Sequence, residues 1–228
     1  MKSLLRFAGA IDRFTRWLGK TAGWIILPLI AVIIFDVVTR KLDVTRLYFS
    51  EITAHTGLSV STILQDLEWH FHAVLLLMTF GFAYLANAHV RVDVFRELLP
   101  HRKQTWLEFF GLLILAVPFL YVMLSEAWQM TSLSFHQGEG SDSLTGIGVR
   151  WIIKSFLIFG FTTAAMAVIA TLMRLLVVLF GGAEDRLDAE RALEIYSDVS
   201  DELKKAREEA ERAVAAEQAA THHKPQSN

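Results

Sequence analysis

Four long apolar segments dominate the hydrophobic pattern of the chain. They cover residues 21–39, 71–90, 109–125 and 155–173. Each approaches the length of about 20 apolar residues that a helix needs to cross a hydrocarbon layer about 30 Å thick. The segments are apolar nearly all round, whereas a surface helix of a soluble protein carries only an apolar stripe. The pattern therefore predicts an all-α integral membrane protein with four transmembrane helices.

The alternative, a soluble protein with four buried core helices, fits the composition poorly. The chain has 228 residues, 53% of them hydrophobic, so little polar sequence remains to cover such helices. It contains no cysteine, which excludes disulfides and cysteine-ligated metals. Basic residues precede the first apolar segment, as in a signal peptide, but no small-residue cleavage site follows it, so we expect this segment to be retained.

Basic residues are unevenly distributed among the polar connections. They are more frequent in residues 1–20, in the connection after the second segment and beyond residue 174 than in the two remaining loops. Because cytoplasmic loops of membrane proteins carry an excess of Lys and Arg, both termini are expected in the cytoplasm of a bacterial inner membrane. Tryptophans near the segment ends are typical of membrane interfaces.

The chain divides into three predicted parts. Residues 1–20 form an amphipathic helix expected to lie in the membrane interface, although a plain helical extension of the first span is the alternative. Residues 21–180 form the four-helix membrane domain. Residues 181–228 form a charged, helical cytoplasmic tail with a disordered end. Thr62 and Gln65 resemble a capping box, so the second membrane helix is expected to begin there, after a long first loop.

Charged side chains are expected at the ends of the spans and not at their centres. Asp36 and Arg40 are spaced for an (i, i+4) pair at the end of the first span. Lys154 and Arg174 flank the fourth span, where long basic side chains can extend to the headgroups. A carrier that works alone would often place polar groups at the membrane midplane, so the uncharged centres favour an accessory role.

The candidate chemistry is sparse. His72 and His89 lie on one helix, about 25 Å apart along its axis, and no other span supplies a histidine, so they cannot share a haem. The acids Glu139 and Asp142 lie in the third loop without an array of oxygen ligands for calcium, and a solvated loop is expected. No nucleotide-binding loop is present. We expect no catalytic site, no cofactor, no bound metal and no nucleic-acid partner.

Two sequence stretches around the second span carry a family resemblance. Residues 64–70 read LQDLEWH before the span, and residues 88–93 read AHVRVD at its end. Together they closely resemble the DctQ-like small membrane subunit of the tripartite ATP-independent periplasmic (TRAP) transporters. The resemblance covers about residues 20–180. Two further stretches, EGS at 139–141 and RWIIK at 150–154, are similar to the branch associated with mannitol or chloroaromatic transport.

The resemblance implies a three-part importer. A periplasmic binding protein would capture a small organic anion such as a carboxylate, and a large membrane subunit would carry it, driven by a sodium gradient in symport. The small subunit would pack against the static scaffold of the large one and bind neither substrate nor sodium. Its expected partners are therefore the large subunit, the binding protein and membrane lipids.

The same resemblance draws attention to the ends of the helices. His89, Arg91 and Asp93 would leave the second helix at the cytoplasmic face, where they would contact headgroups or the large subunit. A periplasmic group would fix helix tilt or dock the binding protein, and plain interfacial anchoring is the alternative for each member. The candidates of this second group are Glu68, Trp69, Arg150, Trp151 and Lys154, and Arg40 is a further candidate for contact with a partner or with lipid.

Two other functions are compatible with four spans. An unrelated membrane assembly factor would co-purify with something other than a large permease. A self-sufficient small transporter would move substrate when reconstituted alone.

Overall fold

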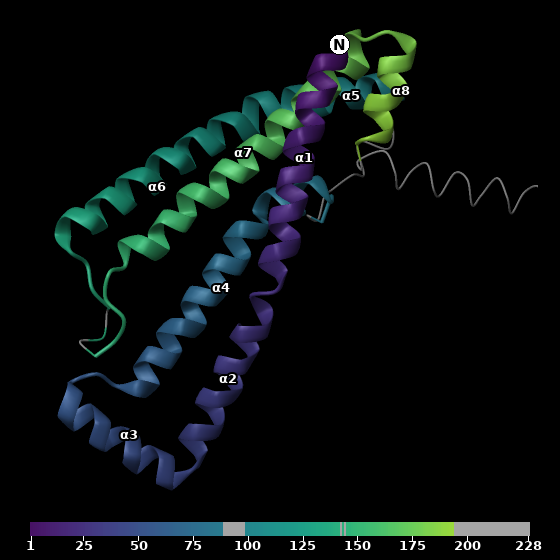
Figure 1. Ribbon diagram of the computed structural model, residues 1–228. Helices are drawn as coiled ribbons and strands as arrows, with labels where there is room; N and C mark the ends of the chain where they lie inside the picture. The colour runs from purple at the N-terminus through teal and green to yellow at the C-terminus, as the bar shows by residue number, and fades with distance from the viewer. Residues whose placement is uncertain (89–98, 142, 144, 194–228) are drawn as a thin grey trace, which may run out of the picture.

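The computed structural model describes residues 1–88, 99–141, 143 and 145–193, and within these it is helical without strands (Figure 1). The predicted all-α class is therefore confirmed. The helices are α1 (Lys2–Gly23), α2 (Ile26–Lys41), α3 (Asp43–Thr56), α4 (Val60–Leu85), α5 (His101–Gly111), the π-helical turn η1 (Leu112–Ala116), α6 (Val117–Gln137), α7 (Trp151–Phe180) and α8 (Ala183–Arg191).

Helices α1 and α2 form one rod with a break at Trp24 and Ile25 (Figure 1). Pro28 explains the break, because it lacks the N–H that would bond to the Trp24 carbonyl and its ring crowds that carbonyl. The carbonyl accepts instead from the Leu27 N–H at 3.2 Å, in a tighter turn. The first predicted span thus continues from the N-terminal helix with only a local irregularity.

The apolar stripe of α1 is partly covered by other helices. Ala8 and Ile11 are buried and cluster with Ala170 of α7, and α1 also packs against α4. Phe7 and Phe14 of the same stripe stay exposed, at 57% and 41%. The helix continues into the first span with a local break, and its place in the membrane interface stays a prediction.

Helices α4 and α7 cross closely because glycines lie at their contact. A Cβ atom on Gly160 of α7 would lie 2.9 Å from the Leu77 carbonyl oxygen, and one on Gly81 of α4 would lie 2.7 Å from the Thr163 carbonyl oxygen. Small residues allow membrane helices to approach in this way. Helices α1 and α2 also pack on α4, while α7, which contacts α1, α4, α5, α6 and α8, lies at the centre of the described bundle.

A long interrupted helix of α5, η1 and α6 runs beside α7 (Figure 1). The Val117 N–H donates to the Leu112 carbonyl, which gives η1 one residue more than an α-helical turn. Pro118 follows directly, so the carbonyl of Ile114 lacks its usual α-helical donor. The sequence pattern did not indicate this irregularity.

Three helical stretches of the described residues are long and apolar enough to cross a membrane: Lys2–Lys41, His101–Gln137 and Trp151–Phe180. The predicted second span, 71–90, overlaps α4 over residues 71–85, and α4 is not among the three. From Phe71 to Leu85 the apolar part of α4 rises only about 22 Å, and its preceding turns carry Glu68 and His70. The four-span count therefore stays a prediction.

The loops are shorter than predicted. Helix α3 occupies most of the first loop and lies across the ends of α2 and α4 (Figure 1). Helix α4 begins before Thr62, at Val60, because the Ser59 side chain accepts from the Thr62 N–H at 3.4 Å and caps the helix. Helix α6 extends to Gln137 and ends at Gly138, which adopts the left-handed conformation (φ 60°) that glycine tolerates.

The tail begins as a helix. Helix α8 packs against the end of α7, where Ala189 and Leu193 are buried with Leu175, Val177 and Val178. The predicted helix beyond it, the disordered end, and the candidates His89, Arg91 and Asp93 lie outside the described residues.

Candidate functional site: a polar layer at the α3 end

Helix α3 and the α6–α7 loop lie at one end of the molecule, which we call the α3 end (Figure 1). A layer of polar side chains crosses this end. It begins at the last turns of α2. The Arg40 Nε and Nη2 atoms bind the two carboxylate oxygens of Asp36 at 3.0 and 2.6 Å. Asp36 is buried, so the two-pronged ion pair compensates the desolvation of its charge. The (i, i+4) pair predicted from the sequence is confirmed.

The Asp36–Arg40 pair connects α2 to the first turns of α4. The Ser61 hydroxyl donates to Asp36 Oδ1 at 3.5 Å. With the Gln65 amide oriented so that its oxygen faces Arg40, that oxygen accepts from Arg40 Nη1 at 3.0 Å and also from Nη2. The guanidinium group of Arg40 thus donates hydrogen bonds to residues of two helices, α2 and α4.

Asp66 holds the α6–α7 loop against α4. Its Oδ2 atom accepts from the Ser141 hydroxyl at 3.0 Å and from the Ile147 N–H at 2.8 Å. Nearby, the Ser59 N–H donates to the Thr145 carbonyl at 3.2 Å. These bonds join segments about eighty residues apart in the chain, so the glycine-rich loop is fastened rather than free.

Glu139 lies between two cations in the same loop. Its carboxylate binds the Lys154 ammonium, and Arg150 Nη1 lies 3.6 Å from Oε1. The Arg150 N–H also donates to the Glu139 carbonyl at 3.1 Å. The hydrogen bond from Lys154 holds the pKa of Glu139 below its ordinary value near 4.5. Lys154 therefore does not extend to headgroups as expected; it anchors the loop.

Two cavities meet at Trp69, which is 79% exposed. One, of about 360 Å³, is lined by Asp66, His70 and Arg150 among others. The other, of about 380 Å³, is mostly apolar and includes Glu68 and residues of α2. A large aromatic side chain left exposed between two cavities is suited to contact with a partner or with the membrane interface.

Trp151 is held by an aromatic neighbour. Its ring packs edge to face on Phe135 of α6, with centroids 5.4 Å apart. This contact fixes the start of α7 against α6. Trp151 therefore connects the ion pairs around Glu139 to the contact between α6 and α7.

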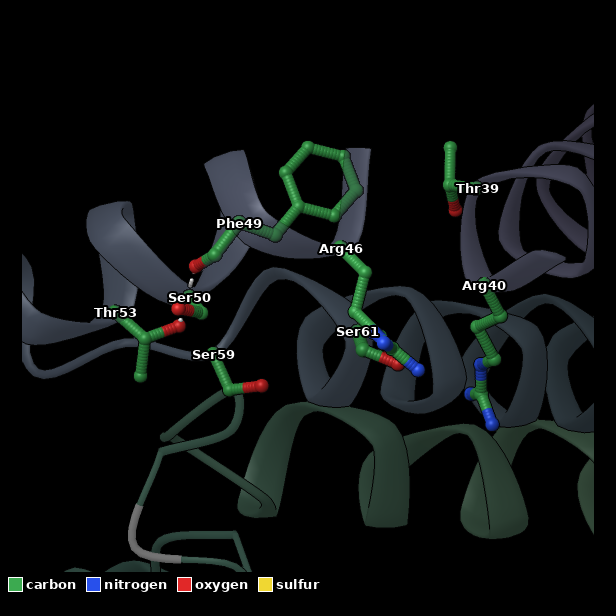
Figure 2. Close-up of a pocket in the computed structure, with 8 residues that line it drawn as sticks. All are labelled: Thr39, Arg40, Arg46, Phe49, Ser50, Thr53, Ser59 and Ser61. Carbon is green, nitrogen blue, oxygen red and sulfur yellow. Dashed lines mark hydrogen bonds between the residues drawn. The ribbon is translucent and has the colours of Figure 1, made fainter. Parts of the chain in front are cut away.

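A third cavity, of about 500 Å³, lies where α2, α3 and α4 meet. Figure 2 shows Arg40 entering it from the end of α2 and Arg46 from α3, with Ser59 and Ser61 on the α4 side. Hydroxyl groups and two guanidinium groups thus border this cavity.

The structure places six candidates at this end: Arg40, Glu68, Trp69, Arg150, Trp151 and Lys154. Sequence reasoning did not identify Asp66 and Glu139 as the acceptors that organise them. The sequence around Asp66 did not indicate its hydrogen-bond partners, because these are a backbone N–H and a serine of a distant loop. The carboxylates of Asp36, Asp66 and Glu139 each accept hydrogen bonds from other parts of the layer, so the arrangement is suited to binding and positioning.

A separate ion pair near the other end corrects a further expectation. Arg174 of α7 was expected to extend toward headgroups, but only 5% of its side chain is exposed. Its Nη2 atom binds Asp12 Oδ2 of α1 at 3.1 Å, and Arg16 binds Oδ1 of the same carboxylate at 2.9 Å. The partner lies 162 residues away in the chain, which sequence spacing could not indicate.

Comparison with known proteins identifies a family. The family model described as "Tripartite ATP-independent periplasmic transporters, DctQ component" matches residues 29–178, well over half of the chain. No curated protein and no solved structure matches the chain. The matched range includes α3, α4 and the whole polar layer. The family, with the three apolar helices, indicates a transporter component of the inner membrane and not an enzyme. The chain belongs to the DctQ family and is a small membrane subunit of a TRAP transporter.

Proposed function

We propose that this chain is the accessory, scaffolding subunit of a sodium-driven TRAP transporter that imports small organic anions, carboxylates first among them. A periplasmic binding protein would deliver the substrate, and a large membrane subunit would move it. The observation that carries the proposal is the family match over residues 29–178. The branch associated with mannitol or chloroaromatic substrates stays a prediction.

The distribution of charge supports an accessory role. Within the four predicted spans, residues 21–39, 71–90, 109–125 and 155–173, the one Asp, Glu, Lys or Arg is Asp36, near the end of the first span. Asp36 and Arg40 belong to the α3 end, and Arg174 pairs with Asp12 toward the other end. A chain that transported an ion and an anion alone would be expected to present polar groups at midplane. The substrate path would therefore lie in the large subunit.

The proposal includes an orientation and a fourth span. Both termini would lie in the cytoplasm and the α3 end in the periplasm, in keeping with the bias of basic residues. Helix α4 would cross the membrane inside the bundle, where α1, α2 and α7 cover it. The polar layer would then face the binding protein.

Reconstitution with single components omitted tests the function. We expect the chain to co-purify with a large permease, and we expect uptake to require that permease, the binding protein, a sodium gradient and this chain. Uptake of substrate by this chain alone would show a self-sufficient transporter. Co-purification with an unrelated complex, and not with a permease, would contradict the scaffold role.

Charge reversal tests the docking role of the polar layer. Arg150→Glu and Glu68→Lys are expected to lower uptake while the permease still co-purifies. Arg186→Glu, which changes an exposed pair on α8, is the matched control and should leave uptake unchanged. If both layer variants transport and assemble as the unmodified chain does, their role is interfacial anchoring.

A further inference from the structure

Helix α3 has an inverted arrangement of polar and apolar side chains. Val44, Leu47 and Tyr48 are 81%, 67% and 62% exposed, and α3 has no buried residue. Arg46, Ser50 and Thr53 occupy the side that lines the third cavity, together with one apolar residue, Phe49. In water the apolar side of a helix turns inward. An outward apolar side, on a helix lying across the ends of two membrane helices, is typical of a helix seated in the headgroup region.

The cavity behind α3 has the chemistry of an anion site. Its described lining has no acidic residue. Asp36 neutralises Arg40 through their bidentate pair, whereas Arg46 has only the exposed partner Asp43 among the described residues and supplies the more weakly compensated positive charge. The Ser59 oxygen already accepts the capping N–H, which leaves its own proton available for donation to a ligand.

The surroundings of the cavity favour an amphiphile over a free anion. Arg40 and Thr39 line it at the end of α2, and the turn before them exposes Val37 and Val38 by 51% and 48%. Ile34 continues this exposed apolar strip along α2, at 58%. Phe49 also lines the cavity, so a headgroup bound there would have apolar surface for its acyl chains on α3 and on α2 within one turn of Arg40.

We propose that this cavity binds the phosphodiester headgroup of an anionic phospholipid, with Arg46 as its principal cationic contact. Guanidinium groups bind phosphate oxygens through paired N–H donors. The hydroxyls of Ser50 and Ser59 complete the donor set from α3 and from the start of α4. The lipid would fill the space between α3 and the bundle and hold α3 at the membrane surface. This site is independent of how the subunit takes part in transport.

Asp43 competes with the lipid for Arg46. Arg46 Nη2 lies 3.1 Å from Asp43 Oδ1, and the two side chains are 70% and 83% exposed. Such an exposed pair is weak and exchanges readily. Neutralising Asp43 should therefore strengthen lipid binding, while neutralising Arg46 should weaken it, although each change removes one charge.

Native mass spectrometry of the full-length chain, titrated with phosphatidylglycerol and separately with phosphatidylcholine, tests the proposal. We expect preferential retention of phosphatidylglycerol. Arg46→Gln should weaken it by at least about tenfold, the effect of losing one charged hydrogen bond, and Asp43→Asn should strengthen it several-fold. Lys41→Gln is the matched control, because Lys41 is an exposed cation of the same end that does not line the cavity.

Four results would overturn the proposal. If Arg46→Gln and Lys41→Gln weaken phosphatidylglycerol binding equally, the lipid is held by general charge attraction. Equal retention of phosphatidylcholine, insensitive to Arg46→Gln, would indicate a site for acyl chains alone. Displacement of the lipid by equimolar inorganic phosphate would indicate a site for free anions. Release of a co-purifying permease by Arg46→Gln, with lipid retention unchanged, would make the cavity a protein interface.

Discussion

Arg174 is the residue whose environment differs most from what its position suggests. A cation near the end of a membrane helix normally reaches the headgroups, yet Arg174 is buried and shares the Asp12 carboxylate with Arg16. Because a buried ion pair offsets its own desolvation only while both partners are present, Asp12 is the residue on which the α1–α7 contact depends.

Replacing Asp12 by Asn should therefore destabilise the protein strongly. It leaves the Arg174 charge buried without a full counter-charge, at a cost of about 3 kcal/mol. Thermal unfolding of the detergent-purified chain measures the effect, with the exposed Asp188→Asn as control. The double variant Asp12→Leu with Arg174→Met, which removes both charges, should recover most of the loss. If the double variant is no more stable than Asp12→Asn alone, the orphaned cation is not the cause.

Glu139 gives the α6–α7 loop a dependence on pH. Because Lys154 lowers the pKa of Glu139 in the folded chain, the unfolded chain takes up a proton first as the pH falls below about 4.5. The stabilisation is thus complete above the unfolded pKa and is lost as the pH falls through the lower, folded one.

Glu139→Gln should remove this part of the pH dependence. We expect the Tm of the unmodified chain to fall more steeply below pH 5 than that of the variant, with the two curves converging at low pH. Parallel curves over the whole range would show that the Glu139 ion pairs do not stabilise the folded state.

At the scale of elements, the crossing of α4 and α7 sets the shape of the bundle. Gly81→Ala should destabilise it by about 1–3 kcal/mol, because the new methyl group would meet the Thr163 carbonyl, which is backbone and cannot rotate away. Gly9→Ala on α1 is the control: nothing lies within 4 Å of its Cβ position, so this change should be neutral or stabilise α1 slightly. Equal Tm shifts for both variants would contradict a close crossing.

The apolar segments were predictable because their length and uniform hydrophobicity are local properties of the chain. Helix α3 was not predictable, because its apolar and polar residues do not follow the pattern of a surface helix in a soluble protein and its polar side faces a cavity. The polar layer was half predictable: Arg40 with Asp36 has helical spacing, whereas Asp66, Glu139 and Asp12 bind partners that only the fold brings near.

At the scale of the whole molecule, the proposed orientation places Ser3 in the cytoplasm and Thr56, at the end of α3, in the periplasm. The natural absence of cysteine makes single-cysteine labelling unambiguous. In intact cells, a membrane-impermeant maleimide should modify Thr56→Cys, whereas Ser3→Cys should react only after permeabilisation. The reverse pattern would invert the orientation and turn the polar layer away from the binding protein.

The π-helical turn η1 divides the long helix beside α7 into two stretches whose buried faces are out of phase. Thr105 is buried in the stretch before η1. If buried positions recurred every seven residues from Thr105 onward, Phe119 and Leu133 would be buried as well. Both are 57% exposed, and the buried positions are each one residue later: Leu120, Ala127 and Ser134. One residue corresponds to about 100° around a helix. A substitution scan along residues 101–137 should therefore show two periodic patterns of sensitivity, displaced by one residue at η1.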